Sequence, residues 1–184
     1  MQRHFFNVDE INLSEFASVC SQTVSSEDYY FASDIQQRVV IYEGEHIQAL
    51  ISTQQAFDLK SELHHCIKEG PGVVVVRQAF QDIKVIDRAT ELFQEIIDEE
   101  KTSDQHRGDH FAKVGENERI WNALQKFCER DTEAFIDYYN NPVLCFVNEA
   151  WLGPFFQMTS QVNIVKPGGQ AQKPHRDYHL GFQE

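Results

Sequence analysis

The segment that decides how this chain is interpreted lies near its end and reads Gln161-Val-Asn-Ile-Val-Lys-Pro-Gly-Gly-Gln-Ala-Gln-Lys-Pro-His175-Arg-Asp177-Tyr-His179. Its His175 and Asp177 stand two positions apart. On a β-strand their side chains point to the same side, because successive side chains alternate between the two faces. An imidazole and a carboxylate in this arrangement are two of the three protein ligands of a two-His-one-carboxylate site for non-haem Fe(II). The pattern therefore predicts a metal site with His175 and Asp177 as ligands.

The sequence does not identify a third ligand among the other histidines, and His106 and His110 lie in a predicted loop whose placement it leaves open. His179 lies on the same predicted face, but four positions along an extended strand separate its Cα from that of His175 by about 13 Å. That distance is too long for both residues to bind one metal, so His179 is interpreted as a lining or packing residue. The neighbours His64 and His65 fall on a predicted helix, where adjacent residues do not share a face, and we expect them at the surface.

Composition indicates a globular protein of one domain. The chain has 184 residues, of which 41% are hydrophobic and 24% are charged, and it carries a net charge of −13. These proportions are typical of a chain that buries a core. The acidity, together with the absence of a Lys/Arg cluster in the sequence, argues against a nucleic-acid partner.

Three features of the sequence favour a cytoplasmic protein. The four cysteines are widely spaced and form no CxxC pair, as expected of reduced thiols rather than a disulfide framework or a structural zinc site. No apolar run approaches the roughly 18–20 residues of a membrane helix. The first residues lack the hydrophobic region of a secretory signal. We therefore expect cytoplasmic localisation and no membrane partner.

Residues up to about 155 predict a mostly helical organisation. Apolar residues recur at spacings of three and four, and predict helices over 9–22, 45–69, 82–101, 117–130, a short stretch capped by Asp131, and a stretch that opens at Asn141-Pro142. Two β-branched runs, 38–42 and 73–76, predict strands, and the second is apolar enough to be buried on both faces. The acidic end of the 82–101 helix opposes the helix dipole and predicts a frayed last turn.

From Phe155 the period of the pattern changes from 3.6 to 2, which indicates a strand. Its apolar positions are Phe156, Met158, Val162 and Ile164, and its polar positions are Gln157, Thr159, Gln161 and Asn163. Residues 167–169, Pro-Gly-Gly, end this strand, and a second strand then carries His175 and Asp177. The predicted fold class is α+β, with a helical N-terminal part that leads into β-structure.

Two parts of this sequence resemble one family. Lys166-Pro167-Gly168, followed after a short loop by Pro174-His175-Arg176-Asp177, is similar to the signature of the phytanoyl-CoA dioxygenase family of Fe(II)/2-oxoglutarate oxygenases. Upstream, the run Gly70-Pro-Gly-Val-Val-Val-Val-Arg-Gln-Ala-Phe80 and the long helix after it resemble that family's opening strand and helix. The resemblance covers about residues 70–184.

The resemblance implies a double-stranded β-helix, which is a jelly-roll or cupin-like barrel, with barrel strands from about residue 155. It also implies that His175 and Asp177 hold Fe(II), with 2-oxoglutarate and O₂ as cosubstrates, and that a small organic molecule is hydroxylated. Because relatives that halogenate lack the carboxylate, Asp177 favours hydroxylation. If the apolar face of the 155–165 strand packs on helices, Gln161 and Asn163 face the barrel interior and are candidates to contact the cosubstrate; the alternative is a half-exposed strand face.

The family pattern also requires a second metal His and, after it, an Arg for 2-oxoglutarate. Only seven residues follow Asp177, so we expect a single truncated domain that is inactive alone. Its parts would be an N-terminal arm with helices over about 1–69 and the start of the oxygenase domain over 70–184, with an incomplete barrel. Two other functions stay open: a non-catalytic acidic helical interaction module, and a cupin-like metal enzyme that does not use 2-oxoglutarate. The sequence identifies neither the substrate nor the oligomeric state.

Overall fold

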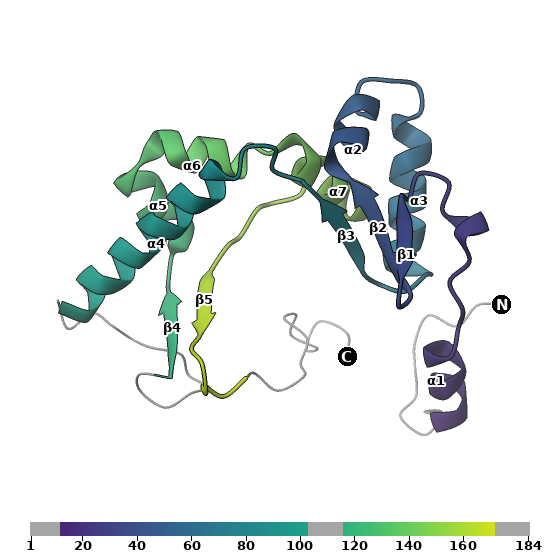
Figure 1. Cartoon of the computed structure of the whole chain (residues 1–184), viewed down its shortest axis with the longest axis horizontal. Coiled ribbons are helices and arrows are strands. Elements are labelled where there is room, and N and C mark those ends of the chain that lie inside the picture. The colour runs from purple at the N-terminus through teal and green to yellow at the C-terminus, as the bar shows by residue number, and fades with distance from the viewer. Residues whose placement is uncertain (1–11, 103–115, 172–184) are drawn as a thin grey trace. The chain divides into compact units, whose positions relative to one another are not determined.

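A computed structural model describes residues 12–102 and 116–171 (Figure 1). The chain divides into two compact units. The first unit comprises Met1–Ala79 and Pro142–Phe155, and the second comprises Phe80–Asn141 and Phe156–Glu184. Both units combine helices with a small sheet, which confirms the predicted mixture of helix and strand.

The first unit is built on a three-stranded sheet in the order β1-β2-β3. Strands β1 (Asp34–Gln36) and β2 (Val39–Glu43) form an antiparallel hairpin, and β3 (Val74–Arg77) pairs parallel to β2. The sequence pattern had indicated β2 and β3 but not β1. Strand β1 has only three residues, which is too short for a period of two to be recognised.

The core of the first unit lies between this sheet and three helices, α2 (Gly44–Leu50), α3 (Ala56–Lys68) and α7 (Pro142–Leu152). Its buried residues are Tyr29, Phe31, Val40, Tyr42, Ile47, Leu50, Leu59, Leu63, Cys66, Val143 and Phe146. The predicted apolar stripe of the 45–69 region is confirmed for Leu59, Leu63 and Cys66, all of which are fully buried. Helix α7 begins at Pro142, as the Asn-Pro pair predicted.

The expectation that the valine run is buried on both faces is wrong for the part of the chain that the structure describes. Val74 and Val76 pack on the core of the first unit, whereas Val75 is 41% exposed and Val73 is 44% exposed. The physical reason is that β3 lies at the edge of the sheet, where only its Val74 and Val76 side packs on the core.

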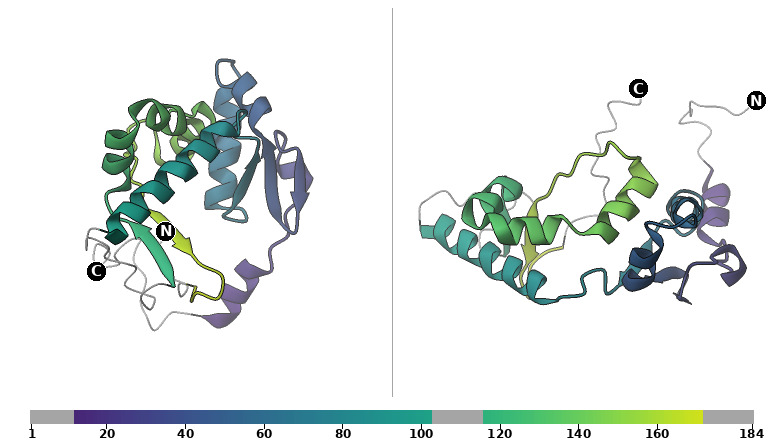
Figure 2. Two further views of the ribbon diagram at one scale, coloured as in Figure 1. Left: turned by 60° about the vertical axis from the view of Figure 1, so that its left-hand side comes forward. Right: turned by 90° about the horizontal axis from the view of Figure 1, so that it is seen from above.

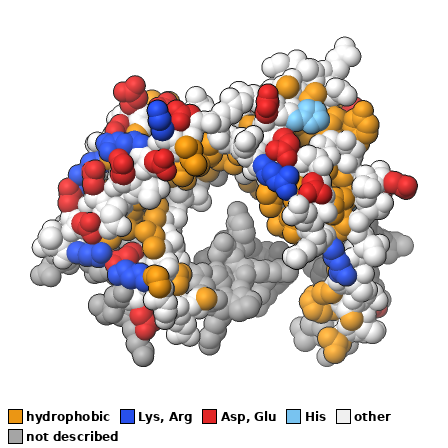
Figure 3. All heavy atoms as spheres, in the orientation of Figure 1, with side chains coloured by type: hydrophobic (Ala, Val, Ile, Leu, Met, Phe, Trp, Pro, Cys, Tyr) orange, Lys and Arg blue, Asp and Glu red, His pale blue; other side chains and the backbone are white. Residues whose placement is uncertain are grey.

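The N-terminal helix α1 (Leu13–Cys20) confirms the helical period over its described residues. The Asn12 side chain caps it by accepting a hydrogen bond from Ser14 N at 2.9 Å. A 3₁₀ turn, η2 (Ser26–Asp28), follows. The apolar residues of α1 are exposed, and hydrophobic side chains reach the surface over this helix (Figure 3).

The second unit packs three helices, α4 (Lys84–Thr102), α5 (Ala123–Arg130) and α6 (Thr132–Tyr139), beside a two-stranded sheet of β4 (Asn117–Ile120) and β5 (Val162–Val165) (Figures 1 and 2). An aromatic cluster joins α4 to α5 and α6 and contains Phe93, Phe127, Phe135, Tyr138 and Tyr139. The predicted cap of α6 is confirmed, because Asp131 Oδ1 accepts a hydrogen bond from Ala134 N at 3.0 Å.

The prediction of a single helix over 117–130 is wrong. Its first four residues are strand β4, a left-handed residue follows at Asn122 (φ 56°), and the helix begins only at Ala123. The apolar spacing that suggested a longer helix places Ile120 in the core through a strand instead. Pairing with β5, a partner more than 40 residues away in the sequence, outweighs the weak local helical preference.

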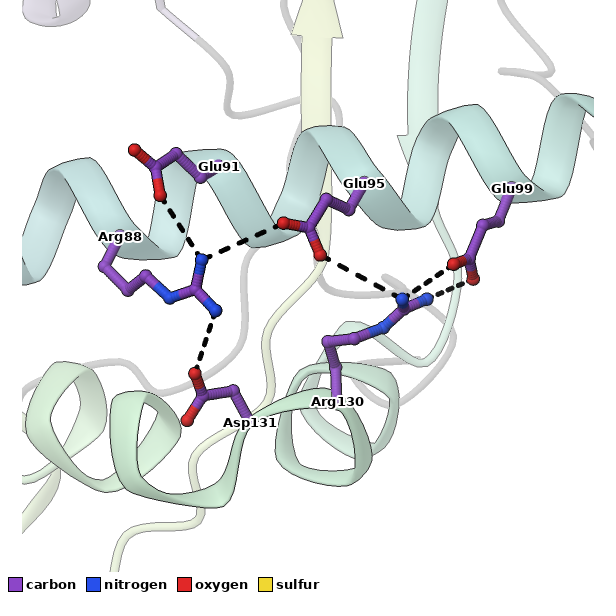
Figure 4. A network of polar contacts seen from close by, with 6 residues as sticks. All are labelled: Arg88, Glu91, Glu95, Glu99, Arg130 and Asp131. Atoms are coloured by element: carbon purple, nitrogen blue, oxygen red, sulfur yellow. Dashed lines mark hydrogen bonds and ion pairs between the residues drawn. The ribbon is translucent and has the colours of Figure 1, made fainter.

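The last turn of α4 is helical to Thr102, and its acidic residues are paired with cations. Arg130 pairs with Glu99, Lys126 pairs with Glu100, and Lys101 lies 3.5 Å from Asp98. Figure 4 shows the network between α4 and the α5–α6 corner, in which Arg88 and Arg130 contact carboxylates that lie one turn apart on α4. Two cations of α5 and Lys101 of α4 itself thus offset the acidic charge that the helix dipole disfavours at this end.

The β-structure of the second unit is smaller than predicted. The strand expected from about 155 spans only Val162–Val165, and no closed barrel is present among residues 12–102 and 116–171. The second predicted strand lies outside the described residues. None of the described helices is long and apolar enough to cross a membrane.

Candidate functional site

Strand β5 is the described element that leads into the segment with His175 and Asp177. It pairs antiparallel with β4, with Val162 opposite Ile120 and Asn163 opposite Arg119 (Figure 2). His175 and Asp177 themselves, like His179, lie outside the described residues.

The two faces of this strand pair differ in chemistry. On one face, Ile120 and Val162 pack against Ile96 and Ile97 of α4. Because side chains alternate along a strand, Arg119 and Asn163 occupy the opposite face. Asn163 is exposed there, and Gln161, which directly precedes β5, is also exposed. Of the predicted apolar face, Val162 packs on the helical side, whereas Met158 and Ile164 are exposed.

Arg119 links the strands on the polar face. Its Nε donates a 3.1 Å hydrogen bond to Gln161 Oε1, and its guanidinium carbon lies 4.3 Å from the centre of the Trp121 ring. Arg119 and Gln161 border a groove of about 740 Å³, which is lined by Arg119, Asn122, Leu124, Gln125, Thr159, Ser160 and Gln161. The groove offers amide, hydroxyl and guanidinium groups, which suit a small polar ligand.

Sequence reasoning identified Gln161 as a candidate and considered the Arg119-Ile120-Trp121 segment for the border of a substrate entrance, but it placed Arg119 on a helix and missed its contact with Gln161. The signal that could have placed Arg119 on a strand is the segment Asn117-Glu118-Arg119-Ile120, in which Arg119 is followed by a buried isoleucine on the opposite face. Four residues are too few for that alternation to outweigh the helical spacing of the longer stretch.

A turn after β5 packs onto β4. The Lys166 amide donates to Glu116 O at 3.1 Å, and Asn117 Nδ2 donates to Gln170 O at 3.4 Å. Gly168 has a φ of 82°, a conformation that favours glycine, and Gly169 N donates to Lys166 O at 2.8 Å. The predicted break at Pro167-Gly168-Gly169 is confirmed.

Glu118 is a buried carboxylate beside this turn. Its side chain is 5% exposed and pairs with Lys166 and with Lys101, whose Nζ lies 3.0 Å from Glu118 Oε1. Burial by itself raises the pKa of Glu118, but the hydrogen bonds from Lys166 and Lys101 outweigh burial and leave that pKa below its ordinary value. Lys166 of the Lys166-Pro167-Gly168 motif thus pairs with a carboxylate of the neighbouring strand.

The described residues do not form a metal site on their own. Residues 12–102 and 116–171 contain no group of three or more His, Cys, Asp or Glu side chains that could hold a metal ion. The surface prediction for His64 is wrong: this half-buried residue places Nδ1 3.0 Å from Ala150 O and its ring beside Trp151. His65 is exposed, as predicted, and lies near Tyr29. The four cysteines are free thiols, of which Cys66 is buried.

A comparison with protein families decides the relationship. The family model described as phytanoyl-CoA dioxygenase matches residues 69–184, more than half of the chain. The chain belongs to the phytanoyl-CoA dioxygenase family. The part that matches this family begins just before β3 and includes α4, the β4–β5 pair, the turn at Pro167-Gly168-Gly169 and the segment with His175 and Asp177. Comparisons with curated proteins and with solved structures gave no match. Membership of the phytanoyl-CoA dioxygenase family indicates an oxygenase-type function that uses Fe(II) and 2-oxoglutarate.

Proposed function

We propose that this chain acts in an Fe(II)/2-oxoglutarate-dependent oxygenase that hydroxylates a small organic molecule. The observation that carries the proposal is the family match, because it covers both the glycine turn after β5 and the His175-Arg-Asp177 segment. The β4–β5 pair has one apolar face on α4 and one polar face. This pattern supports the proposal that the two strands belong to a jelly-roll barrel.

The donor set fits the metal. His175 and Asp177 would hold Fe(II) through an imidazole nitrogen and a carboxylate oxygen, a combination that suits this ion and leaves positions open. The described residues supply no competing group of ligands. When bound, the iron supplies, with 2-oxoglutarate and O₂, the oxidising chemistry for breaking an unactivated C–H bond. The carboxylate of Asp177 favours hydroxylation over halogenation.

The chain's own residues would bind and orient the reactants. Gln161 and Asn163 present amide groups on the polar face of β5, and each amide both donates and accepts hydrogen bonds. These groups suit the carboxylate and keto oxygens of 2-oxoglutarate or a polar group of the substrate. Arg119 holds the Gln161 side chain from the paired strand, which restricts the directions in which its amide can point.

Titration with Mn(II), a redox-silent substitute for Fe(II), tests the proposal. The experiment measures Mn(II) binding to the chain by calorimetry, with and without 2-oxoglutarate. We expect weak binding that 2-oxoglutarate strengthens and that is lost in His175→Ala and in Asp177→Ala. His179→Ala is the matched control, because strand geometry excludes it as a ligand beside His175.

Two other results would point to the alternative functions. Mn(II) binding that depends on His175 but not on 2-oxoglutarate would indicate a cupin-like metal enzyme that does not use this cosubstrate. If the wild-type chain binds no Mn(II), the oxygenase proposal fails and a non-catalytic interaction module becomes the better explanation.

A further inference from the structure

We propose that the groove beside the β4–β5 pair binds a small monocarboxylic acid through Arg119. The proposal goes beyond the proposed function, because binding in this groove needs neither iron nor 2-oxoglutarate. The residues that line the groove all belong to the second unit and lie within the described part of the chain. The site can therefore be described and tested without reference to the metal ligands.

The charge of the groove favours an anion. Arg119 contributes a guanidinium, and none of the described residues that line the groove is Asp or Glu. The whole chain carries a net charge of −13, so a small anion meets less repulsion at this lining than over the acidic surface elsewhere. A carboxylate carries one negative charge, whereas a phosphate group carries about −1.5 to −2 at pH 7. A single guanidinium therefore matches a carboxylate better than a phosphate.

Two contacts hold the Arg119 guanidinium in a defined orientation. Its carbon lies 4.3 Å from the centre of the Trp121 ring, and its Nε and Nη2 both donate to Gln161 Oε1. A donor that is already oriented loses less side-chain entropy when a ligand binds. The planar guanidinium also matches the geometry of a carboxylate, which accepts hydrogen bonds through both of its oxygens.

The neutral groups of the groove also act as donors. Arg119 has only N–H donors, so the atom of Gln161 that faces it is the amide oxygen, and the Gln161 NH₂ group is left to donate to a ligand. Tyr139 donates a 2.8 Å hydrogen bond to Ser160 Oγ. Burial raises the pKa of Tyr139, which keeps the phenol protonated and acting as the donor. The hydroxyl hydrogen of Ser160 is therefore left for an acceptor.

These donors together select the class of ligand. A carboxylate only accepts hydrogen bonds, and the guanidinium, the Gln161 amide and the Ser160 hydroxyl all offer hydrogens. Leu124 adds a half-buried apolar side chain to the lining. An apolar side chain beside the donors suits an organic acid rather than an inorganic anion.

Titration of the full chain with sodium benzoate tests the proposal. Binding is followed by nuclear magnetic resonance through the backbone amide of Ser160 and the side-chain amide of Gln161. The solution contains EDTA at constant ionic strength, so that no metal ion contributes. Benzamide is the matched neutral probe, because it has a similar shape and no charge. We expect benzoate to bind at least about tenfold more tightly than benzamide, since its hydrogen bonds are charge-assisted.

Variants of the full chain then assign the binding to the groove. We expect Arg119→Gln to weaken benzoate binding about tenfold and Ser160→Ala to weaken it about threefold, with benzamide binding unchanged. Arg119→Lys keeps the charge without the planar group and should lie between Arg119→Gln and the wild type. Arg88→Gln is the matched control, because it removes the same charge from an exposed arginine of α4 that does not line the groove. If Arg119→Gln does not fold, the losses in Ser160→Ala and Arg119→Lys decide the question.

Four results would overturn the proposal. Two of them are equal affinities for benzoate and benzamide, and equal losses of benzoate binding in the Arg119 variants and in Arg88→Gln. Tighter binding of phenyl phosphate than of benzoate would indicate a site for a dianion. Tighter binding of 2-oxoglutarate without metal would assign the groove to the cosubstrate instead. Because the solution contains no free metal ion, the proposed function can fail in the Mn(II) titration while benzoate still binds, and the reverse.

Discussion

The hydroxyl of Tyr42 donates a 2.9 Å hydrogen bond to Glu62 Oε1 inside the first unit. Tyr42 is 1% exposed, and the same carboxylate also accepts a hydrogen bond from Phe31 N at 3.1 Å. Burial, followed by the charge of Glu62, raises the pKa of Tyr42 well above its ordinary value, so the phenol stays protonated and acts as a donor. The contact joins β2 to α3 across the core of this unit.

Removing this donor should destabilise the protein measurably. We expect Tyr42→Phe to lower the free energy of unfolding by about 1.5–3 kcal/mol, the usual range for a hydrogen bond to a charged group. Urea unfolding followed by circular dichroism measures the change. Tyr30→Phe is the control, since Tyr30 is 81% exposed and should change stability by less than about 0.5 kcal/mol. Equal effects of the two substitutions would contradict the role assigned to Tyr42.

We expect the hairpin between β1 and β2 to be stabilised by a residue that adopts positive φ easily. Gln37 and Arg38 form its two-residue loop, and both have positive φ, at 50° and 69°. Loops of this kind favour asparagine at the first position. We expect Gln37→Asn to raise the free energy of unfolding by about 0.5 kcal/mol. The control Gln36→Asn places the same change on strand β1, where asparagine is disfavoured, and should lower it.

Gly44 should not accept a side chain. A Cβ at this position would lie 2.4 Å from Gln78 O, a backbone atom that follows β3. We therefore expect Gly44→Ala to lower the melting temperature by more than 10 °C, since about 3 kcal/mol of overpacking is a large part of the stability of a small unit. Gly153→Ala, which has a φ of 83° but open space around its Cβ, should cost only about 1 kcal/mol. A larger shift in the control would show that steric contact at Gly44 is not decisive.

The contribution of Glu118 to stability should depend on pH. Its pKa in the folded protein lies below the ordinary value of 4.5, so the ionised form stabilises the fold. That stabilisation is fully present above the unfolded pKa and is lost as the pH falls through the lower, folded-state pKa. The difference in unfolding free energy between the wild type and Glu118→Gln should therefore be constant from pH 6 to pH 7 and shrink below about pH 4. A difference that grows on acidification would contradict the assigned direction.

Much of the helical structure could be predicted because its determinants are local. Leu59, Leu63 and Cys66 recur with the helical period and are buried together, and Asp131 caps α6 from an adjacent position. The errors occur where the partner is distant in the sequence. The residues of β4 form a strand because β5 pairs with them, and the acidic end of α4 is neutralised because Lys126 and Arg130 reach it from α5.

The candidate site likewise combines features that are local in the sequence with contacts that only the fold creates. The prediction that His175 and Asp177 are metal ligands comes from the sequence by itself, because a spacing of two residues on a predicted strand is a local relationship. The sequence also determined the turn at Pro167-Gly168-Gly169, whose backbone preferences are intrinsic to those residues. The tertiary structure alone decided that Arg119 contacts Gln161 and that Glu118 joins Lys101 to Lys166. Those contacts connect residues separated by 17 to 48 positions, and only the packing of α4 against the β4–β5 pair brings them within hydrogen-bonding distance.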